Sequence, residues 1–255
     1  MLDVLEDVNA VCPVHGSISP LYLLGRDGVT HQQYVAPDVV FQDQSYDLLL
    51  PTSAQLDIGA CLGKGTFGEV HEGRLFYTDT RVADRVAVKI VFKQARDRRD
   101  ISKGFQSYLE QACSAYLTVR QEMSILSRLQ HPHIVPLVAL NLQPLSLLLM
   151  LAPCGGLDAK LRQLEGQGDH LPLFVVRQIT IQVAKAMSYL HCHNIIYRDL
   201  KSDNVLVWEL PGSGDAPPTS GVDVKLADYG ISRSVLPSGT RGFGGTPPFI
   251  APEIL

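Results

Sequence analysis

Three short segments that follow one another from residue 55 place the strongest constraint on the fold. They read QLDIGACL at 55–62, FGEVHEGRLF at 67–76 and RVAVKIVF at 85–92. Each segment is short, mostly apolar and rich in β-branched or aromatic residues, which is typical of β-strands. A domain that begins here is therefore predicted to open with a three-stranded sheet.

The segments downstream add helices to this sheet. Apolar residues keep a helical spacing over 104–129, and the apolar runs IVPLVAL and LSLLLML predict an antiparallel strand pair. A second helix is predicted over 172–191, with one apolar face made of Val176, Ile179, Val183, Met187 and Leu190. The order predicts an α+β fold in which a five-stranded region with one helix precedes a mostly helical region.

A boundary falls near Pro51-Thr52-Ser53, where turn-forming residues precede the first predicted strand. Residues 1–54 carry few helix signals. We therefore expect a linker over 1–54 and a folded domain over 55–255.

Composition excludes several classes of function. The 255 residues include 22 Lys and Arg against 26 Asp and Glu, a net charge of −4, which does not favour a nucleic-acid partner. The longest apolar run, 147–152, is far shorter than the roughly 20 residues that span a bilayer. Five scattered cysteines and an acidic N-terminal segment predict reduced thiols and a cytoplasmic location.

The segment LGKGTFGEV places Gly63, Gly65 and Gly68 in a G-x-G-x-x-G arrangement. Glycines let backbone N–H groups approach phosphate oxygens closely. A dinucleotide-binding fold would need a helix after the glycines, but EVHEGRLF alternates like a strand. A glycine-rich hairpin is the better interpretation.

Polar residues that could take part in a reaction follow further along the chain. Lys89 lies within the apolar strand VAVK, where an ammonium group needs an anionic partner. IIYRDLKSDNVLV then carries Arg198, Asp199, Lys201 and Asn204 between a predicted helix and a predicted strand. LADYG supplies Asp228, and TPPFIAPE ends with the tripeptide Ala-Pro-Glu at 251–253.

In this order and spacing, the motifs resemble the protein-kinase signature: a glycine loop, a strand lysine, D-x-K-x-x-N, D-x-G and A-P-E. The resemblance covers about 55–255. YRDLKSDN and DYG are most similar to the leucine-rich-repeat Roco kinases, in which a Roc GTPase and a COR module precede the kinase. This resemblance implies a bilobal kinase fold, with a five-stranded N-lobe containing helix C and a mostly helical C-lobe. It also suggests that the end of a COR-like module lies within 1–54.

The resemblance also implies roles for individual residues. Asp199 would accept or orient the proton of the substrate hydroxyl, and Lys201 would neutralise charge on the transferred phosphoryl group. Asn204 and Asp228 would bind Mg²⁺, while Lys89 would hold the α- and β-phosphates of ATP. The D-L-K sequence is typical of serine/threonine kinases, so a Ser or Thr acceptor is expected.

Lys89 would need a carboxylate from the helix to stay ordered, and Glu110 and Glu122 both qualify. We favour Glu122 because it lies nine residues before His131, as in the family's arrangement. Further nucleotide contacts would come from residues of the glycine loop, the adenine slot and the hinge: Leu62, Gly63, Gly65, Gly68, Val70, Ala87, Leu149, Met150, Ala152 and Leu206.

The sequence departs from the family pattern in three places. Tyr197 and Tyr229 replace the usual His and Phe, and a buried tyrosine hydroxyl needs a hydrogen-bond partner. The third departure is that the chain ends at Leu255, two residues past the A-P-E motif. We therefore expect an incomplete C-lobe and weak activity for the isolated chain.

Arg198 beside Asp199 suggests that a phosphate on the segment 231–250 orders that segment. The candidate acceptors are Ser232, Ser234, Ser238, Thr240 and Thr246. For Thr246 the alternative is a structural role.

Two alternatives to an active kinase remain open at this point: a nucleotide-binding pseudokinase and a truncated, non-catalytic scaffold fragment. The resemblance suggests a protein substrate of the Rab-type GTPase class and dimerisation through regions outside this chain. Neither nucleic acid nor a membrane span is expected.

Overall fold

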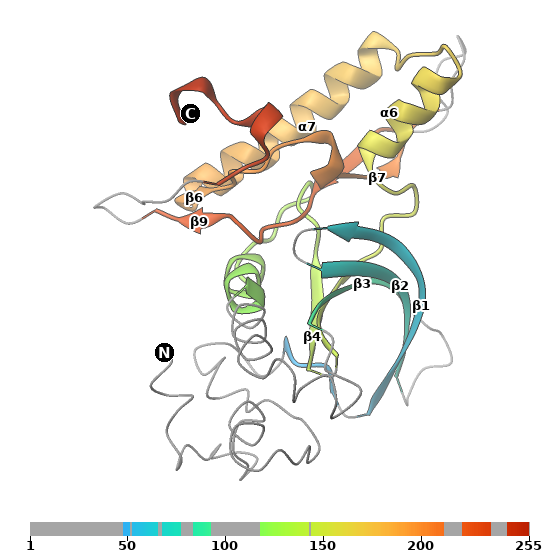
Figure 1. Cartoon of the computed structure of the whole chain (residues 1–255), viewed down its shortest axis with the longest axis vertical. Helices are drawn as coiled ribbons and strands as arrows, with labels where there is room; N and C mark the ends of the chain where they lie inside the picture. The colour runs from blue at the N-terminus through green and yellow to red at the C-terminus, as the bar shows by residue number, and fades with distance from the viewer. Residues whose placement is uncertain are drawn as a thin grey trace, which may run out of the picture. The chain divides into compact units, whose positions relative to one another are not determined.

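The computed structural model describes residues 48–51, 53–65, 68–77, 84–92, 118–142, 144–211, 221–235 and 244–254 (Figure 1). The chain divides into two units, Met1–Ser124 with Leu137–Leu149, and Ile125–Pro136 with Met150–Leu255. We call them the first and second unit. Most of the predicted linker 1–54, the helix residues 104–117 with Glu110, and the candidate acceptors Ser238 and Thr240 lie outside the described residues.

The first unit contains a five-stranded sheet in the order β1-β2-β3-β5-β4. The strand bounds are β1 Ala54–Gly65, β2 Gly68–Tyr77, β3 Asp84–Phe92, β4 Leu137–Leu142 and β5 Leu145–Met150. The pairs β1–β2, β2–β3 and β4–β5 are antiparallel. All five predicted strands are therefore confirmed.

The start of β4 differs from the prediction, which began the strand at Ile134. Ile134 instead forms a bridge to Leu226 in the second unit, while β4 begins at Leu137. Pro136 separates the two segments, and a proline has no N–H to donate to a sheet ladder.

The buried side of this sheet follows from the alternation along β3. Val86, Val88 and Ile90 are buried in one cluster with residues from β2, β4 and β5. Ala87 and Lys89, on the alternate positions, are buried as well. β3 is therefore enclosed on both sides, which explains why its sequence reads as a nearly continuous apolar run.

The described part of the first predicted helix is helical over 118–126. Val119, Met123, Leu126 and Leu129, which the periodicity placed on its apolar face, are all buried. The helical turn ends before His131-Pro132, as predicted.

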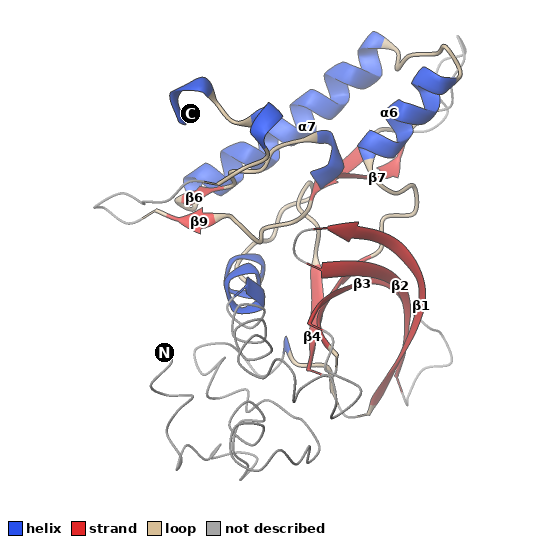
Figure 2. Ribbon diagram, in the orientation of Figure 1, coloured by secondary structure: helices blue, strands red, loops and turns tan. Residues whose placement is uncertain are grey.

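The second unit combines helices with short strands (Figure 2). Its elements are α6 Leu157–Gly166, α7 Leu173–Cys192, β6 Ile195–Ile196, η2 Ser202–Asn204, β7 Val205–Glu209, β8 Asp223–Leu226, β9 Arg233–Ser234, η3 Pro247–Phe249 and η4 Pro252–Ile254. β6 pairs with β9 and β7 with β8, both antiparallel. Within the described part of the chain, no helix combines the length and apolar character needed to cross a membrane.

The buried face of α7 corrects the predicted one. Ile179 and Leu190 are buried as expected, but Val176 is 43% exposed, and Val183 and Met187 are only half-buried. The buried positions are Val175, Ile179, Gln182, Ala186 and Leu190.

Gln182 explains this rotation of the face. Its side-chain Nε2 donates to the carbonyl of Val222 at 2.6 Å, and its Oε1 accepts from the N–H of Val224 at 2.9 Å. The helix therefore turns a polar residue inward because it satisfies the backbone of β8. The spacing of apolar residues alone predicts that such a glutamine lies on the exposed face of the helix.

Candidate active site

Lys89 and Glu122 form a buried ion pair in the first unit. The Lys89 ammonium lies 2.8 and 3.0 Å from the two carboxylate oxygens of Glu122. The two side chains are 8% and 0% exposed. The strand lysine and the helix carboxylate chosen from the sequence are thus brought together, and the ammonium has the anionic partner that its burial requires.

The glycine-rich segment joins β1 to β2, with Gly65 opposite Gly68 in the register. Gly68 has φ +126°, and a Cβ built there would lie 2.1 Å from the Ile90 carbonyl oxygen. Only glycine fits this position. Apart from the chain neighbours, no atom of the described residues lies within 4 Å of a Cβ added at Gly63 or Gly65.

Asp199 is the centre of a hydrogen-bonded cluster in the second unit. Its Oδ1 accepts from the Thr246 hydroxyl at 2.6 Å. Its Oδ2 accepts from the Asn204 amide at 2.9 Å and from the Lys201 ammonium at 2.9 Å. Lys201 also donates to the Thr246 hydroxyl at 2.7 Å. The predicted residues Asp199, Lys201 and Asn204 therefore lie together.

The same contacts set the protonation state of Asp199. Burial alone raises the pKa of this carboxyl group, but hydrogen bonds from Thr246, Lys201 and Asn204 outweigh burial and hold its pKa below the ordinary value. Asp199 is therefore a carboxylate at neutral pH. It can accept a hydrogen bond from a substrate hydroxyl.

Asn204 and Asp228 offer oxygen atoms suited to a hard cation. The Asn204 Nδ2 group donates both to the carbonyl and to the Oδ2 of Asp199, and Asn204 is buried. Among the described residues, no donor contacts its amide oxygen. Asp228 follows directly on Ala227, whose N–H donates to the Asn204 carbonyl at 2.9 Å. One carboxylate and one amide oxygen fit Mg²⁺, which takes few protein ligands and completes its shell with water and phosphate oxygens.

A metal ion could also be held by protein side chains alone. The described ranges contain no group of three or more His, Cys, Asp or Glu side chains that could hold a metal ion.

The residues predicted for the adenine slot are divided between the units. Leu62, Val70, Ala87 and Leu149 lie on strands of the first unit. Met150, Ala152 and Leu206 belong to the second unit. Their grouping around an adenine ring stays a prediction.

Two of the candidate phosphate acceptors are already engaged. Ser232 is fully buried, and Thr246 bonds to both Asp199 and Lys201. The structural role for Thr246 was one of the alternatives drawn from the sequence. No sequence signal set Ser232 apart from the other serines. Ser234 is exposed in β9.

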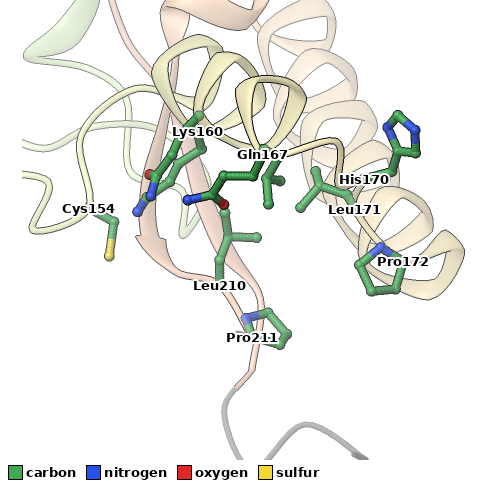
Figure 3. A pocket seen from close by; sticks show the side chains of 10 residues that line it. Cys154, Lys160, Gln167, His170, Leu171, Pro172, Leu210 and Pro211 are labelled. Carbon is green, nitrogen blue, oxygen red and sulfur yellow. The ribbon is translucent and has the colours of Figure 1, made fainter. Parts of the chain in front are cut away.

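A cavity of about 190 Å³ lies elsewhere in the second unit (Figure 3). Its lining comes from α6 and the residues next to it, from the segment before α7 and from the segment after β7: Cys154, Lys160, Gln163, Leu164, Gln167, His170, Leu171, Pro172, Leu210 and Pro211. None of the predicted catalytic residues lines it, so it is separate from the Asp199 cluster.

Comparisons with known proteins agree with this geometry. The family model of the protein kinase domain matches residues 56–255. Leucine-rich repeat serine/threonine-protein kinase 1 of Caenorhabditis elegans is 40% identical over 96% of this chain and 10% of its own length. Its mouse counterpart, from Mus musculus, is 43% identical over 53% of this chain and 6% of its own length. Serine/threonine-protein kinase TIO of Arabidopsis thaliana is 30% identical over 76% of this chain and 12% of its own length.

The chain thus spans about a tenth of the length of these curated relatives. The expected resemblance to leucine-rich-repeat serine/threonine kinases and the expected kinase fold are confirmed.

Proposed function

The chain belongs to the protein kinase family, and on that premise we propose that it transfers the γ-phosphoryl group of Mg-ATP to a serine or threonine hydroxyl of a protein. The observation that carries the proposal is the Asp199 cluster, in which a buried carboxylate is held by Lys201, Asn204 and Thr246. Serine/threonine kinases among the relatives support the acceptor class.

The reaction requires little covalent chemistry from the protein. The acceptor oxygen forms a bond to the γ-phosphorus as the bond to the β–γ bridging oxygen breaks; ADP leaves, and the hydroxyl proton passes to Asp199 late in the transfer. Asp199, already ionised, accepts a hydrogen bond from the acceptor hydroxyl and orients its oxygen. Lys201 lies beside it and offers its positive charge to the transferred group.

Lys89, kept ordered by Glu122, holds the α- and β-phosphates. The backbone of Gly63 and Gly65 covers the phosphates, because no side chain of its own and no other described segment of the chain blocks a close approach at these glycines. Asn204 and Asp228 hold the metal through their oxygens. Magnesium, when bound, neutralises phosphate charge during transfer.

The finer assignments rest on the family resemblance. We propose a protein substrate of the Rab-type small GTPase class, dimerisation through regions outside this chain, and a cytoplasmic location. A direct comparison of purified Rab-type and unrelated GTPases as acceptors tests the first of these proposals.

Substitution of Asp199 tests the proposed reaction. Asp199→Asn keeps the shape of the side chain but removes its negative charge, so phosphoryl transfer should fall by about 10²-fold or more. Transfer is measured with radiolabelled ATP, to the chain itself and to casein. Asp169→Asn is the matched control, because among the described residues the Asp169 side chain contacts only the N–H of His170.

Nucleotide binding, measured by calorimetry, separates the alternatives. Binding with transfer that depends on Asp199 supports the kinase. Binding of ATP without any transfer favours a pseudokinase. The absence of both Mg-ATP binding and transfer refutes the proposed function and favours a scaffold role.

A further inference from the structure

Asp228 has an unusual backbone conformation. Its φ is +59°, in the left-handed region, which is unfavourable for a non-glycine residue and persists only where the surrounding structure enforces it. Its own Oδ1 accepts from the N–H of Gly230 at 3.3 Å, a long contact. Contacts of the residues on either side of Asp228 help to hold this conformation.

Both neighbours of Asp228 contact Tyr197. The Tyr197 hydroxyl donates a short hydrogen bond to the carbonyl of Ala227. The Tyr229 ring lies edge-on to the Tyr197 ring, with centroids 5.2 Å apart and an interplanar angle of 68°. Both tyrosines are fully buried. The position of Tyr197 therefore fixes the chain before and after Asp228.

Ser232 in turn connects to the backbone of Tyr197. Its hydroxyl donates to the Tyr197 carbonyl at 2.9 Å, and the serine is fully buried. The β6–β9 register pairs Ile196 with Arg233, and one further step would set Tyr197 opposite Ser232.

The Ser232 N–H does not donate to Tyr197 at this position of the register, because it donates to the carbonyl of Tyr229 at 3.1 Å. The hydroxyl of Ser232 therefore takes the place of the next ladder hydrogen bond. One serine thus closes the turn over 229–232 through its N–H and ties that turn to Tyr197 through its side chain.

We propose that Ser232 is a positioning residue for Asp228: its hydroxyl joins the segment after Asp228 to the backbone of Tyr197 and so holds the Asp228 carboxylate in its metal-binding arrangement. This proposal rests on the proposed function, in which Asp228 binds magnesium. It assigns the buried serine a role in metal binding and removes it from the set of phosphate acceptors.

Amide hydrogen exchange tests the positioning without any ligand. Ser232→Ala should raise exchange over 226–231 about fivefold relative to the wild-type chain, the factor that corresponds to one net hydrogen bond. Ser232→Cys keeps the size of the side chain but donates weakly, and it should behave like alanine. Ser188→Ala, the same change at an exposed position of α7, is the control and should leave 226–231 unchanged.

The metal dependence of nucleotide binding is the second measurement. The ratio of the Kd of a non-hydrolysable ATP analogue without Mg²⁺ to its Kd with Mg²⁺ should fall about fivefold in Ser232→Ala and Ser232→Cys. The affinity without Mg²⁺ should not change, whereas a general loss of folded protein would alter both values.

Each result decides one claim. Unchanged exchange over 226–231 in Ser232→Ala, or full protection in Ser232→Cys, overturns the positioning role. Raised exchange with an unchanged Mg²⁺ effect also overturns it. If the wild-type chain shows no Mg²⁺ effect, the proposed function fails together with the metal-binding part, while the exchange data still decide whether Ser232 holds the segment.

Discussion

Replacing Glu122 by leucine should destabilise the first unit by about 3–5 kcal/mol. The carboxylate accepts two charge-assisted hydrogen bonds from Lys89, at 2.8 and 3.0 Å, and is fully buried. Its removal leaves an ammonium group in a site where the lysine side chain is only 8% exposed. Most of the loss is the cost of keeping the ammonium group buried without the Glu122 carboxylate.

Lys89→Met should cost a similar amount, because it leaves the Glu122 carboxylate buried without the ammonium. The double variant should be more stable than either single variant. Two apolar side chains of similar volume often replace a buried ion pair with little change in stability. A large coupling free energy between the two positions is therefore the distinctive result.

The free energies of unfolding come from urea denaturation followed by circular dichroism. Amide exchange of β3 then shows whether the change is local to Asp84–Phe92. The reasoning is refuted if the double variant loses the sum of the two single losses to within about 0.5 kcal/mol, because independent sites add in that way.

Two further predictions concern the pH dependence of stability and the glycine-rich hairpin. Burial, with nearby histidine and lysine charges, lowers the pKa of His131, so the folded chain binds fewer protons there than the unfolded chain. The stability contributed by this group is thus present above the unfolded pKa of about 6.5 and is lost as the pH falls below it. Urea midpoints from Trp208 fluorescence should decrease from pH 7.5 to 5.5, and the decrease should be smaller in His131→Asn; equal decreases would contradict the assignment. Gly68→Ala should cost about 2 kcal/mol or more, because the added Cβ would meet a backbone oxygen at 2.1 Å, whereas Gly65→Ala should cost less than about 1 kcal/mol. Thermal or urea denaturation measures both, and equal losses would show that the hairpin does not need glycine at position 68.

The elements that the sequence predicts well are those with many buried side chains. β3 buries Val86, Val88 and Ile90 on one side and Ala87 on the other, and the resulting apolar run is directly visible in the sequence. In contrast, α6 was not predicted: Leu157, Leu161 and Leu164 stand at the helical spacing i, i+4 and i+7, but only Leu157 is buried. β6 and β9 have two residues each, too few to show any period.

Some residues of the candidate site could likewise be predicted from the sequence, and others could not. Lys89, Asp199 and Asn204 stand in a fixed order along the chain, so a motif can identify them. Thr246 reaches Asp199 across 47 residues, and Ser232 reaches Tyr197 across 35. Such contacts depend on how distant segments fold back on one another. The residue type of a single serine or threonine does not indicate which distant residue it contacts.

The hydrogen bonds on Asp199 have a consequence for the timing of proton transfer in the proposed reaction. A carboxylate that already accepts from Thr246, Lys201 and Asn204 has a reduced affinity for another proton. The acceptor hydroxyl should therefore keep its proton through the loose transition state, in which the new phosphorus–oxygen bond is little formed. Acceptors whose hydroxyl groups differ in acidity should then react at nearly the same rate, with a Brønsted coefficient close to zero. Selection among protein substrates would have to come from the residues around the hydroxyl, and the hydroxyl itself would contribute little.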